Sequence, residues 1–336
     1  MRMEPTLADR FLSHLRGRLG AGVDYAETPA PLSGGFDTTI LAFRLSGVPA
    51  AWSGPLILRV MTRADQGPRV LREAAVHMAL VQAGFPAPRV LLHDAEPAPL
   101  GLPFLVMERL PGETMWSALA KAGPTAMLAM PRQLAELHVR LHRVSGEGLR
   151  ESARALGVDP AAMGVQDDLE RLRRRIARDG LGALLPAADW LIAHFPAPAQ
   201  AEVICHGDFH PLNIMVDRGQ VSGVIDWANV VLGEPAYDVA ALRTIGLYAD
   251  LGVPAWARGA TNLVRRLMVR RYMRLYRAAA PLETRNLPYY EAIRILSALI
   301  FAGEPRSQPA NPWNAPHTVK RLVAEFERIT GLHVRV

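Results

Sequence analysis

Three polar residues that could do chemistry lie within one short run of the sequence. Asp208 follows the apolar stretch 201–205, Asn213 comes five residues later, and Asp226 ends the apolar stretch 221–225. Carboxylate and amide oxygens suit a hard cation such as Mg²⁺, and a further carboxylate can accept the proton of a hydroxyl. This division of labour is that of phosphoryl transfer, with Asn213 and Asp226 on the metal and Asp208 positioning and deprotonating the acceptor.

A β-hairpin is the element expected to position these residues. The apolar runs 214–216 and 221–225 are separated by the polar tetrad 217–220, which contains a glycine where a tight turn needs one. A hairpin brings its two ends together. We therefore predict that Asn213 and Asp226 meet at its open end, beside the turn that carries Asp208.

The same motif carries a family resemblance. His206-Gly207-Asp208, followed by Asn213 and then by Ile225-Asp226-Trp227, resembles the signature of the aminoglycoside phosphotransferase and choline kinase-like family, which shares the protein-kinase fold. The resemblance implies ATP and Mg²⁺ as cofactors. It also implies transfer of the γ-phosphoryl group of ATP to a hydroxyl of a small molecule, such as an aminoglycoside-like antibiotic, a sugar or an amino alcohol.

The implied fold is α+β and bilobal. Residues 1–110 are expected to form a small, mostly β, nucleotide-binding lobe with one helix, and residues 111–336 a larger, mostly α lobe that holds the catalytic turn and the acceptor. The chain length suits one large or two modest lobes. The Pro-Gly turn at 111–112 is a natural hinge between them.

Two segments of the first lobe are expected to contact the nucleotide phosphates. Ser33, Gly34 and Gly35 form a small-residue turn before a strand pattern, which could aim backbone N–H groups at phosphate oxygens or could be a plain hairpin turn. Arg59 stands in the strand 56–61, where the family has a lysine. The first lysine of this chain is Lys121. An arginine is a wider, forked donor and is not equivalent to an ammonium group.

A helix over 67–81 follows, opened by a proline. Its Glu73 could reach Arg59 and anchor it. The alternative is an intrahelical pair with Arg69, four residues earlier, which would contribute only about 0.2–0.5 kcal/mol. In the family, the backbone of the strand before the hinge binds the adenine, and the matching candidates are Met107, Glu108 and Leu110.

Composition limits the partners and the compartment. The net charge is +6 and the pI is ≈ 9.9. The arginines are spread along several helices, many beside acids, and the tightest cluster, 173–175, is short and lacks flanking aromatics, so we predict no nucleic-acid partner. Cys205 is the only cysteine and reads as a core thiol. No apolar stretch is long enough for a secretory signal or a membrane span. We expect a cytoplasmic protein with no membrane partner, and the sequence does not predict an oligomeric state.

The short segment after Asp226 limits the acceptor. Only a brief loop fits before a helix that starts near Asp238, whereas protein kinases need a long activation segment there. The acceptor is therefore expected to be a small molecule rather than a protein. Asp238 is expected to be structural, by capping that helix or bracing the catalytic turn, and Glu234 could face the substrate.

Other patterns leave alternatives open. His138 and His142 stand one helical turn apart, but no further ligand completes a metal motif, so core or surface histidines are favoured. The substitution of Arg59 for a lysine keeps open a non-catalytic nucleotide-binding pseudokinase or regulatory module. A polycationic substrate such as an aminoglycoside would need a cleft lined by acids, but the candidate acids are too scattered in the sequence to indicate one. They are Asp159, Asp167, Asp168, Glu170, Glu234 and Glu304.

Overall fold

The structure is a computed structural model, and it describes residues 6–32, 38–98, 100–303 and 311–335. The chain divides into two compact units. The first takes in the described residues up to Thr114 together with Glu147–Asp159 and Ile214–Ala228. The second takes in Met115–Gly146, Pro160–Asn213 and the described residues from Asn229 onward. Both units are therefore assembled from segments that are distant in the sequence.

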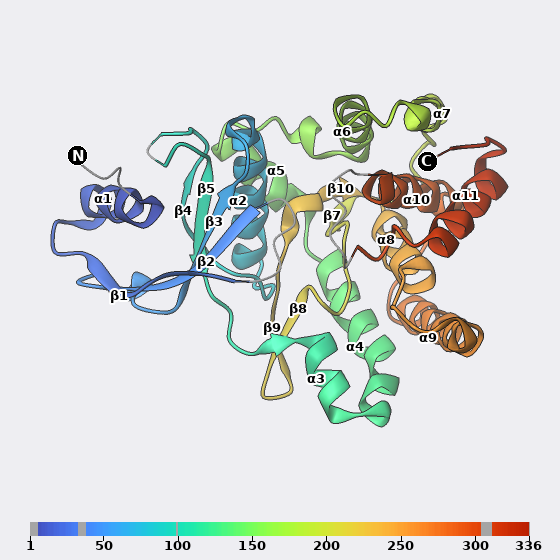
Figure 1. The fold of residues 1–336 in the computed structure, drawn as a ribbon, viewed down its shortest axis with the longest axis horizontal. Coiled ribbons are helices and arrows are strands. Elements are labelled where there is room, and N and C mark those ends of the chain that lie inside the picture. Colours follow the sequence, from blue (N-terminus) through green and yellow to red (C-terminus); the bar gives the residue numbers. More distant parts are fainter. Residues whose placement is uncertain (1–5, 33–37, 99, 304–310, 336) are drawn as a thin grey trace. The chain divides into compact units, whose positions relative to one another are not determined.

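An antiparallel sheet of order β1-β2-β3-β5-β4 forms the centre of the first unit (Figure 1). Its strands are β1 (Asp24–Pro31), β2 (Thr38–Ser46), β3 (Leu56–Met61), β4 (Val90–Asp94) and β5 (Phe104–Glu108). The helices of this unit are α1 (Leu7–Leu19), α2 (Gly67–Gln82) and most of α5 (Gly146–Ala155). A smaller sheet, β6-β8-β9, combines β6 (Glu113–Thr114) with β8 (Ile214–Asp217) and β9 (Gln220–Val224).

The alternation of β3 explains how the central sheet positions Arg59. Leu56, Leu58 and Val60 belong to a core cluster with Phe11 of α1. The intervening side chains point to the other face, because successive side chains of a strand alternate. On that face Met61 packs with residues of α2, so Arg59 is directed toward α2 as well.

The second unit is mostly helical. Its helices are α3 (Met115–Ala122), α4 (Pro124–His142), α6 (Val165–Arg178), α7 (Leu185–Ala193), α8 (Pro235–Tyr248), α9 (Arg258–Ala279), α10 (Leu287–Gly303) and α11 (Pro316–Thr330). Its strands β7 (Val203–Cys205) and β10 (Val231–Gly233) pair antiparallel. This arrangement confirms the predicted α+β composition, with the sheet early in the chain and the helices later.

The helices pack largely as their apolar periodicity predicts. Leu134, Leu137 and Leu141 of α4 are buried, whereas Leu128 is 53% exposed although its spacing would place it with the apolar residues of the helix. Leu128 lies near the start of α4, ahead of the buried residues that begin with Pro131. None of the described helices is both long and apolar enough to cross a membrane.

Candidate active site

The catalytic turn, residues 206–208, follows β7 directly. Gly207 has φ +76°, a conformation that favours glycine, and a Cβ there would lie 2.3 Å from the backbone oxygen of Asn229. Both the dihedral angle and the space require glycine at this position. The fixed turn presents Asp208 at the end of a buried strand, as the sequence predicts.

Asp238, in the first turn of α8, braces this turn. Its side chain is fully buried and accepts the backbone N–H groups of His206 (2.7 Å) and Gly207 (2.8 Å). Burial alone would raise the pKa of Asp238, but the neighbouring His138 and His142 outweigh it and hold the pKa well below the ordinary value. The bracing role predicted as one alternative for Asp238 is the one that the structure shows.

Asn213 and His210 contact the Asp208 carboxylate directly. Asn213 Nδ2 donates to the backbone oxygen of Asp208 (3.0 Å) and to its Oδ2 (3.3 Å). His210 Nε2 lies 3.4 Å from the same Oδ2, and the Asp208 side chain keeps 29% of its surface exposed. Burial alone would raise the pKa of Asp208, but His210 and Arg294 outweigh this effect and lower the pKa to about 2. The carboxylate is therefore ionised and accessible at neutral pH.

His210 and Arg294 are the neighbours of Asp208 that the sequence did not identify. Arg294, on α10, donates to the Tyr237 hydroxyl (3.3 Å), which donates to Asp168 Oδ2 (2.7 Å). His210 could have been found from its position two residues after Asp208. Arg294 is 86 residues away in the sequence and carries no local signal. The Arg294 guanidinium makes the surroundings of Asp208 more positive than the motif alone suggests.

The predicted hairpin is present in the first unit. Ile214 of β8 pairs with Val224 of β9, and the turn between the strands contains Arg218 and Gly219 at φ 47° and 77°. Two consecutive residues with positive φ form the tight turn that suits a two-residue hairpin. Asn213 immediately precedes β8. Asp226 follows β9 and has φ 63°, a sparsely populated conformation for a residue with a side chain.

Arg59 is the centre of a buried ion-pair network in the first unit. Its Nη1 donates to Glu73 Oε2 (2.8 Å), its Nη2 to Asp226 Oδ1 (3.1 Å) and its Nε to Thr38 Oγ1 (3.2 Å). The Arg59 side chain is 10% exposed, and that of Asp226 is 47% exposed. The forked guanidinium thus joins α2 to the residue predicted to bind metal, which a single ammonium point charge does less readily.

Both contacts considered for Glu73 are present. Its Oε2 pairs with Arg59, and its Oε1 accepts from Arg69 Nε (2.9 Å) in an i, i+4 arrangement. Burial alone would raise the pKa of the Glu73 carboxyl, but the two arginines outweigh it and lower the pKa. The side chain is only 1% exposed, so a buried anion is held between two cations.

The hinge candidates lie at the end of β5. The Glu108 N–H donates to the Arg89 oxygen (3.0 Å), and the Arg109 N–H donates to the Pro55 oxygen (2.9 Å). The Glu108 side chain pairs with Arg89. Leu110 follows the strand, and among the described residues its N–H has no backbone acceptor. Met107 is buried within the sheet.

Two other expectations have different outcomes. Ser33, Gly34 and Gly35, the proposed phosphate-contacting turn, lie outside the described residues. The suggestion that Glu234 faces the substrate is wrong. Glu234 is 3% exposed, and its carboxylate accepts the backbone N–H of Gln200 (2.9 Å) and the side-chain amide of Asn286 (3.2 Å). It secures the loop before β7 instead.

His138 and His142 belong to the core, as expected. Their Nε2 atoms lie 3.0 and 3.3 Å from Asp238 Oδ2, and their Nδ1 atoms lie 2.7 and 2.6 Å from the hydroxyls of Tyr272 and Tyr276. Burial lowers the pKa of His138 to about 4, so the ring is neutral at pH 7. The sequence offered no third partner because Asp238 lies 96 residues beyond His142.

Comparison with known proteins identifies the family. Residues 28–282 match the model of the Phosphotransferase enzyme family. The chain belongs to this family. The resemblance inferred from the catalytic motif is therefore confirmed, and family membership supports the predicted class of small-molecule phosphotransferase.

The chain aligns with only part of the length of its curated relatives. The chain is 30% identical over 178 residues to acyl-CoA dehydrogenase family member 11 of Gallus gallus, covering 51% of the chain and 22% of that protein. It is 30% identical over 176 residues to viomycin phosphotransferase of Streptomyces vinaceus, covering 49% of the chain and 58% of the relative. The chain thus spans about a fifth of the dehydrogenase relative.

Solved structures confirm the predicted kinase-like phosphotransferase fold. A Ralstonia eutropha JMP134 protein named as a candidate aminoglycoside phosphotransferase aligns with a TM-score of 0.61 at 17% identity, over 97% of this chain and 98% of that one. Aminoglycoside phosphotransferase APH(4)-Ia, in a complex with ADP and hygromycin B, aligns with a TM-score of 0.57 at 18% identity, over 95% and 97%. Identities this low establish the fold alone.

Proposed function

We propose that this protein transfers the γ-phosphoryl group of ATP to a hydroxyl group of a small molecule. The observation that carries the proposal is the ionised, accessible Asp208 carboxylate on a turn fixed by Gly207 and Asp238. Family membership supports phosphoryl transfer. The choice of ATP is supported by the ADP complex of a structural neighbour.

Asp208 is proposed to orient the acceptor hydroxyl and to take its proton. As the new bond forms between the acceptor oxygen and phosphorus, the bond from phosphorus to the bridging oxygen of ADP breaks, and the proton passes to the Asp208 carboxylate. A carboxylate with a pKa of about 2 is a weak base, so we expect proton transfer late in the reaction, when the hydroxyl has become acidic. Asn213 fixes the carboxylate through its Nδ2.

The donor set fits a magnesium ion with bound phosphates. Asp226 and Asn213 offer the carboxylate and amide oxygens that a hard cation prefers, and Asp226 is half-exposed. When bound, Mg²⁺ would neutralise phosphate charge. We propose that Arg59 binds the phosphates while Glu73 anchors it, in the role that relatives give to a lysine. The Leu110 N–H is the candidate donor to adenine.

The charges around Asp208 bear on the acceptor. Arg294 and His210 both contribute positive potential at its carboxylate. A neutral or anionic hydroxyl compound is therefore favoured over a polycationic aminoglycoside. The names of two relatives suggest further compounds to test, viomycin and acyl-CoA thioesters, the latter in hydroxylated form because the proposed reaction needs a hydroxyl group.

An ADP-release assay over a panel of hydroxyl compounds tests this function. The panel contains aminoglycosides, viomycin, sugars, amino alcohols and hydroxylated acyl thioesters, each with ATP and Mg²⁺. We expect acceptor-dependent release with at least one class, and Asp208→Asn should abolish it while ATP binding is retained. ATP binding without any turnover across the panel would favour the pseudokinase alternative. Near-normal turnover by Asp208→Asn would remove Asp208 from its assigned role.

A further inference from the structure

Helix α9 has an unusual charge composition. It contains seven arginines and no acidic residue, and the sequence from 251 to 282 is free of aspartate and glutamate. Elsewhere in the chain many arginines pair with nearby acids, for example Arg243 with Glu291 and Arg328 with Glu325. Among the described residues, Arg266, Arg270, Arg271 and Arg274 have no such acidic partner. The helix therefore presents uncompensated positive charge.

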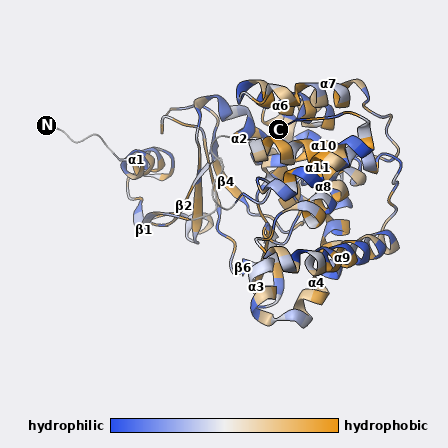
Figure 2. Cartoon of the chain, turned by 45° about the vertical axis from the view of Figure 1, so that its right-hand side comes forward, coloured by the Kyte–Doolittle hydropathy of each residue, from blue (hydrophilic) through white to orange (hydrophobic). Residues whose placement is uncertain are grey.

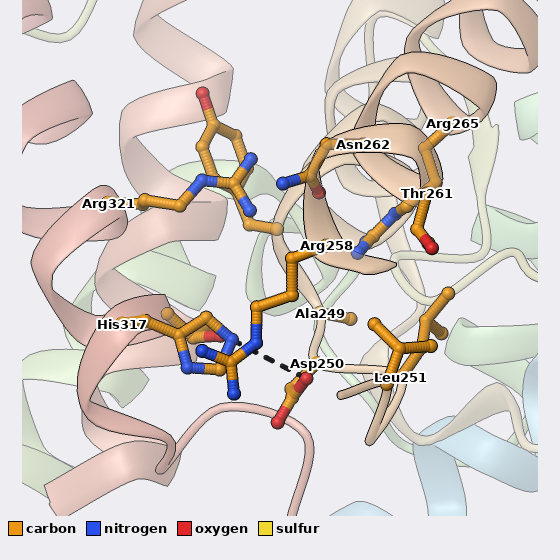
Figure 3. Close-up of a pocket in the computed structure, with 12 residues that line it drawn as sticks. Ala249, Asp250, Leu251, Arg258, Thr261, Asn262, Arg265, His317 and Arg321 are labelled. Atoms are coloured by element: carbon orange, nitrogen blue, oxygen red, sulfur yellow. Dashed lines mark ion pairs between the residues drawn. The ribbon is translucent and has the colours of Figure 1, made fainter. Parts of the chain in front are cut away.

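The inner side of α9 packs against α4 and α8 and shares a small pocket with α11. Arg265 donates to the carbonyl oxygens of Gly246 (2.6 Å) and Ile245 (2.9 Å), which lie near the C-terminus of α8. Figure 3 shows Arg258, Thr261, Asn262 and Arg265 of α9 lining a small pocket with His317 and Arg321 of α11. These contacts fix the rotation of α9 about its own axis.

The opposite side of α9 is apolar over its first half. With 3.6 residues per turn, Leu263, Val264 and Leu267 fall opposite the residues that line the pocket. They are 58%, 55% and 53% exposed, and Trp256, just before the helix, is 87% exposed. In Figure 2, α9 carries both hydrophobic and hydrophilic colours along its length. We call these four residues the apolar stripe.

Arginines continue the same side and flank it. Arg270, Arg271 and Arg274 are exposed and follow the apolar stripe along the helix. Beside the stripe, an open groove of ≈ 580 Å³ is lined by five arginines and one glutamate among its ten residues; the arginines are Arg243, Arg266, Arg270, Arg321 and Arg328. Exposed aliphatic groups and a dense set of arginines thus lie on one side of α9, and the exposed Trp256 directly precedes the helix.

We propose that this face docks on the surface of an anionic phospholipid bilayer. Trp256 and the leucines would enter the boundary between headgroups and acyl chains, where tryptophan is enriched, while the arginines bind lipid phosphates. The positive charge of this face favours an anionic bilayer over a second copy of the chain, because two such faces in contact would bring uncompensated arginines together. The proposal departs from the sequence-based expectation of no membrane partner, since periodicity did not show that the stripe faces solvent.

Vesicle co-sedimentation of the purified full chain tests the proposal. One vesicle set is phosphatidylcholine alone, and in the other phosphatidylglycerol replaces a third of it. We expect binding to the anionic vesicles only, weakened by high salt. The paired substitutions Arg270→Glu and Arg271→Glu should weaken it at least roughly 25-fold, about fivefold per lost arginine contact. Leu263→Ser and Leu267→Ser should each weaken it roughly tenfold.

Two matched controls test whether the effect belongs to this face. Leu128→Ser removes a leucine of α4 that is also 53% exposed, and Arg218→Glu reverses a charge whose side chain is 92% exposed on the β8–β9 turn. Both should bind anionic vesicles as the wild type does. Circular dichroism melting would confirm that each variant is folded, which is expected because all the substituted side chains are exposed.

Several outcomes would overturn the proposal. Absence of binding to anionic vesicles by the folded wild type would do so, as would binding that the α9 variants leave unchanged. A concentration-dependent dimer broken by Leu267→Ser in light scattering would assign the face to a second copy instead. Binding by an acidic protein but by no vesicle would assign it to a protein partner. None of these results depends on whether the proposed phosphotransferase activity is found.

Discussion

Replacing Arg59 by methionine should destabilise the first unit. The change removes the cation that contacts Glu73 at 2.8 Å, where the carboxylate is 1% and the guanidinium 10% exposed. Breaking a buried pair by removing one partner costs about 3–5 kcal/mol. Because Arg69 still contacts Glu73 at 2.9 Å, we expect the lower end of that range, about 3 kcal/mol. Urea unfolding followed by circular dichroism measures the change.

A double variant separates the structural role of Arg59 from its proposed binding role. Glu73→Met in the Arg59→Met background removes the stranded carboxylate, so the two losses should not add, and about 2 kcal/mol should be recovered. ATP affinity should not recover. A charge-assisted hydrogen bond contributes about 1.5–3 kcal/mol, which corresponds to roughly a tenfold to hundredfold weaker Kd in calorimetric titration with Mg²⁺-ATP.

The neighbouring strand offers a matched control. Arg44 of β2 lies 3.8 Å from Glu27, and both side chains are well exposed, so Arg44→Met should cost less than about 1 kcal/mol and leave ATP affinity unchanged. A double variant that binds ATP as tightly as the wild type would show that Arg59 serves the fold alone. A single Arg59→Met variant with unchanged stability would refute the argument from burial.

Further predictions concern the catalytic turn. Because the pKa of Asp208 is about 2, protonation of this residue should not lower kcat between about pH 5 and 8. A decrease of kcat toward pH 5 that disappears in Asp208→Glu would contradict this. The unfolded chain protonates His138 near its ordinary pKa of 6.5, whereas the folded chain does so only near 4, so stability should fall by about 3 kcal/mol as pH drops through that window. Thermal unfolding of wild type and His138→Gln across the window would test it, and identical pH profiles would refute it. Gly207→Ala should cost at least about 2 kcal/mol and most turnover, because a Cβ would meet the Asn229 oxygen at 2.3 Å; an unchanged urea midpoint would contradict it. Asp238→Asn should cost about 2–3 kcal/mol and slow turnover, since an amide group would face a backbone N–H; normal kinetics would show that the turn holds without this brace.

The sequence predicted those elements that carry a continuous or periodic run of apolar side chains. The strands β2, β3 and β5 and the helix α2 have such runs and were found with small shifts at their ends. The edge strand β1 was missed because most of its residues are exposed and two are prolines, so no alternation marks it. Short pairings such as that of β10 with β7 depend on partners distant in the sequence, which periodicity cannot reveal.

The candidate site shows the same limit. The β8–β9 hairpin and its turn are local, so the sequence indicated them directly. The contact between Arg59 and Glu73 was reachable because a strand and the next helix are neighbours in the chain. The role of Arg294 could not be predicted, because only the packing of α10 brings this residue toward Asp208. Glu234 was misassigned because a polar residue after a loop looks the same whether it faces substrate or satisfies buried N–H groups.

The orientation of the hydrogen bonds behind the catalytic turn follows from the charge of Asp238. An ionised carboxylate can only accept, so the Nε2 atoms that face it must carry their protons. The Nδ1 atom of the neutral His138 then accepts from the Tyr272 hydroxyl. These polar contacts link α9 through α4 to Asp238. Asp238 also accepts the two backbone N–H groups of the turn, which leaves the peptide geometry at Asp208 dependent on a fully buried anion.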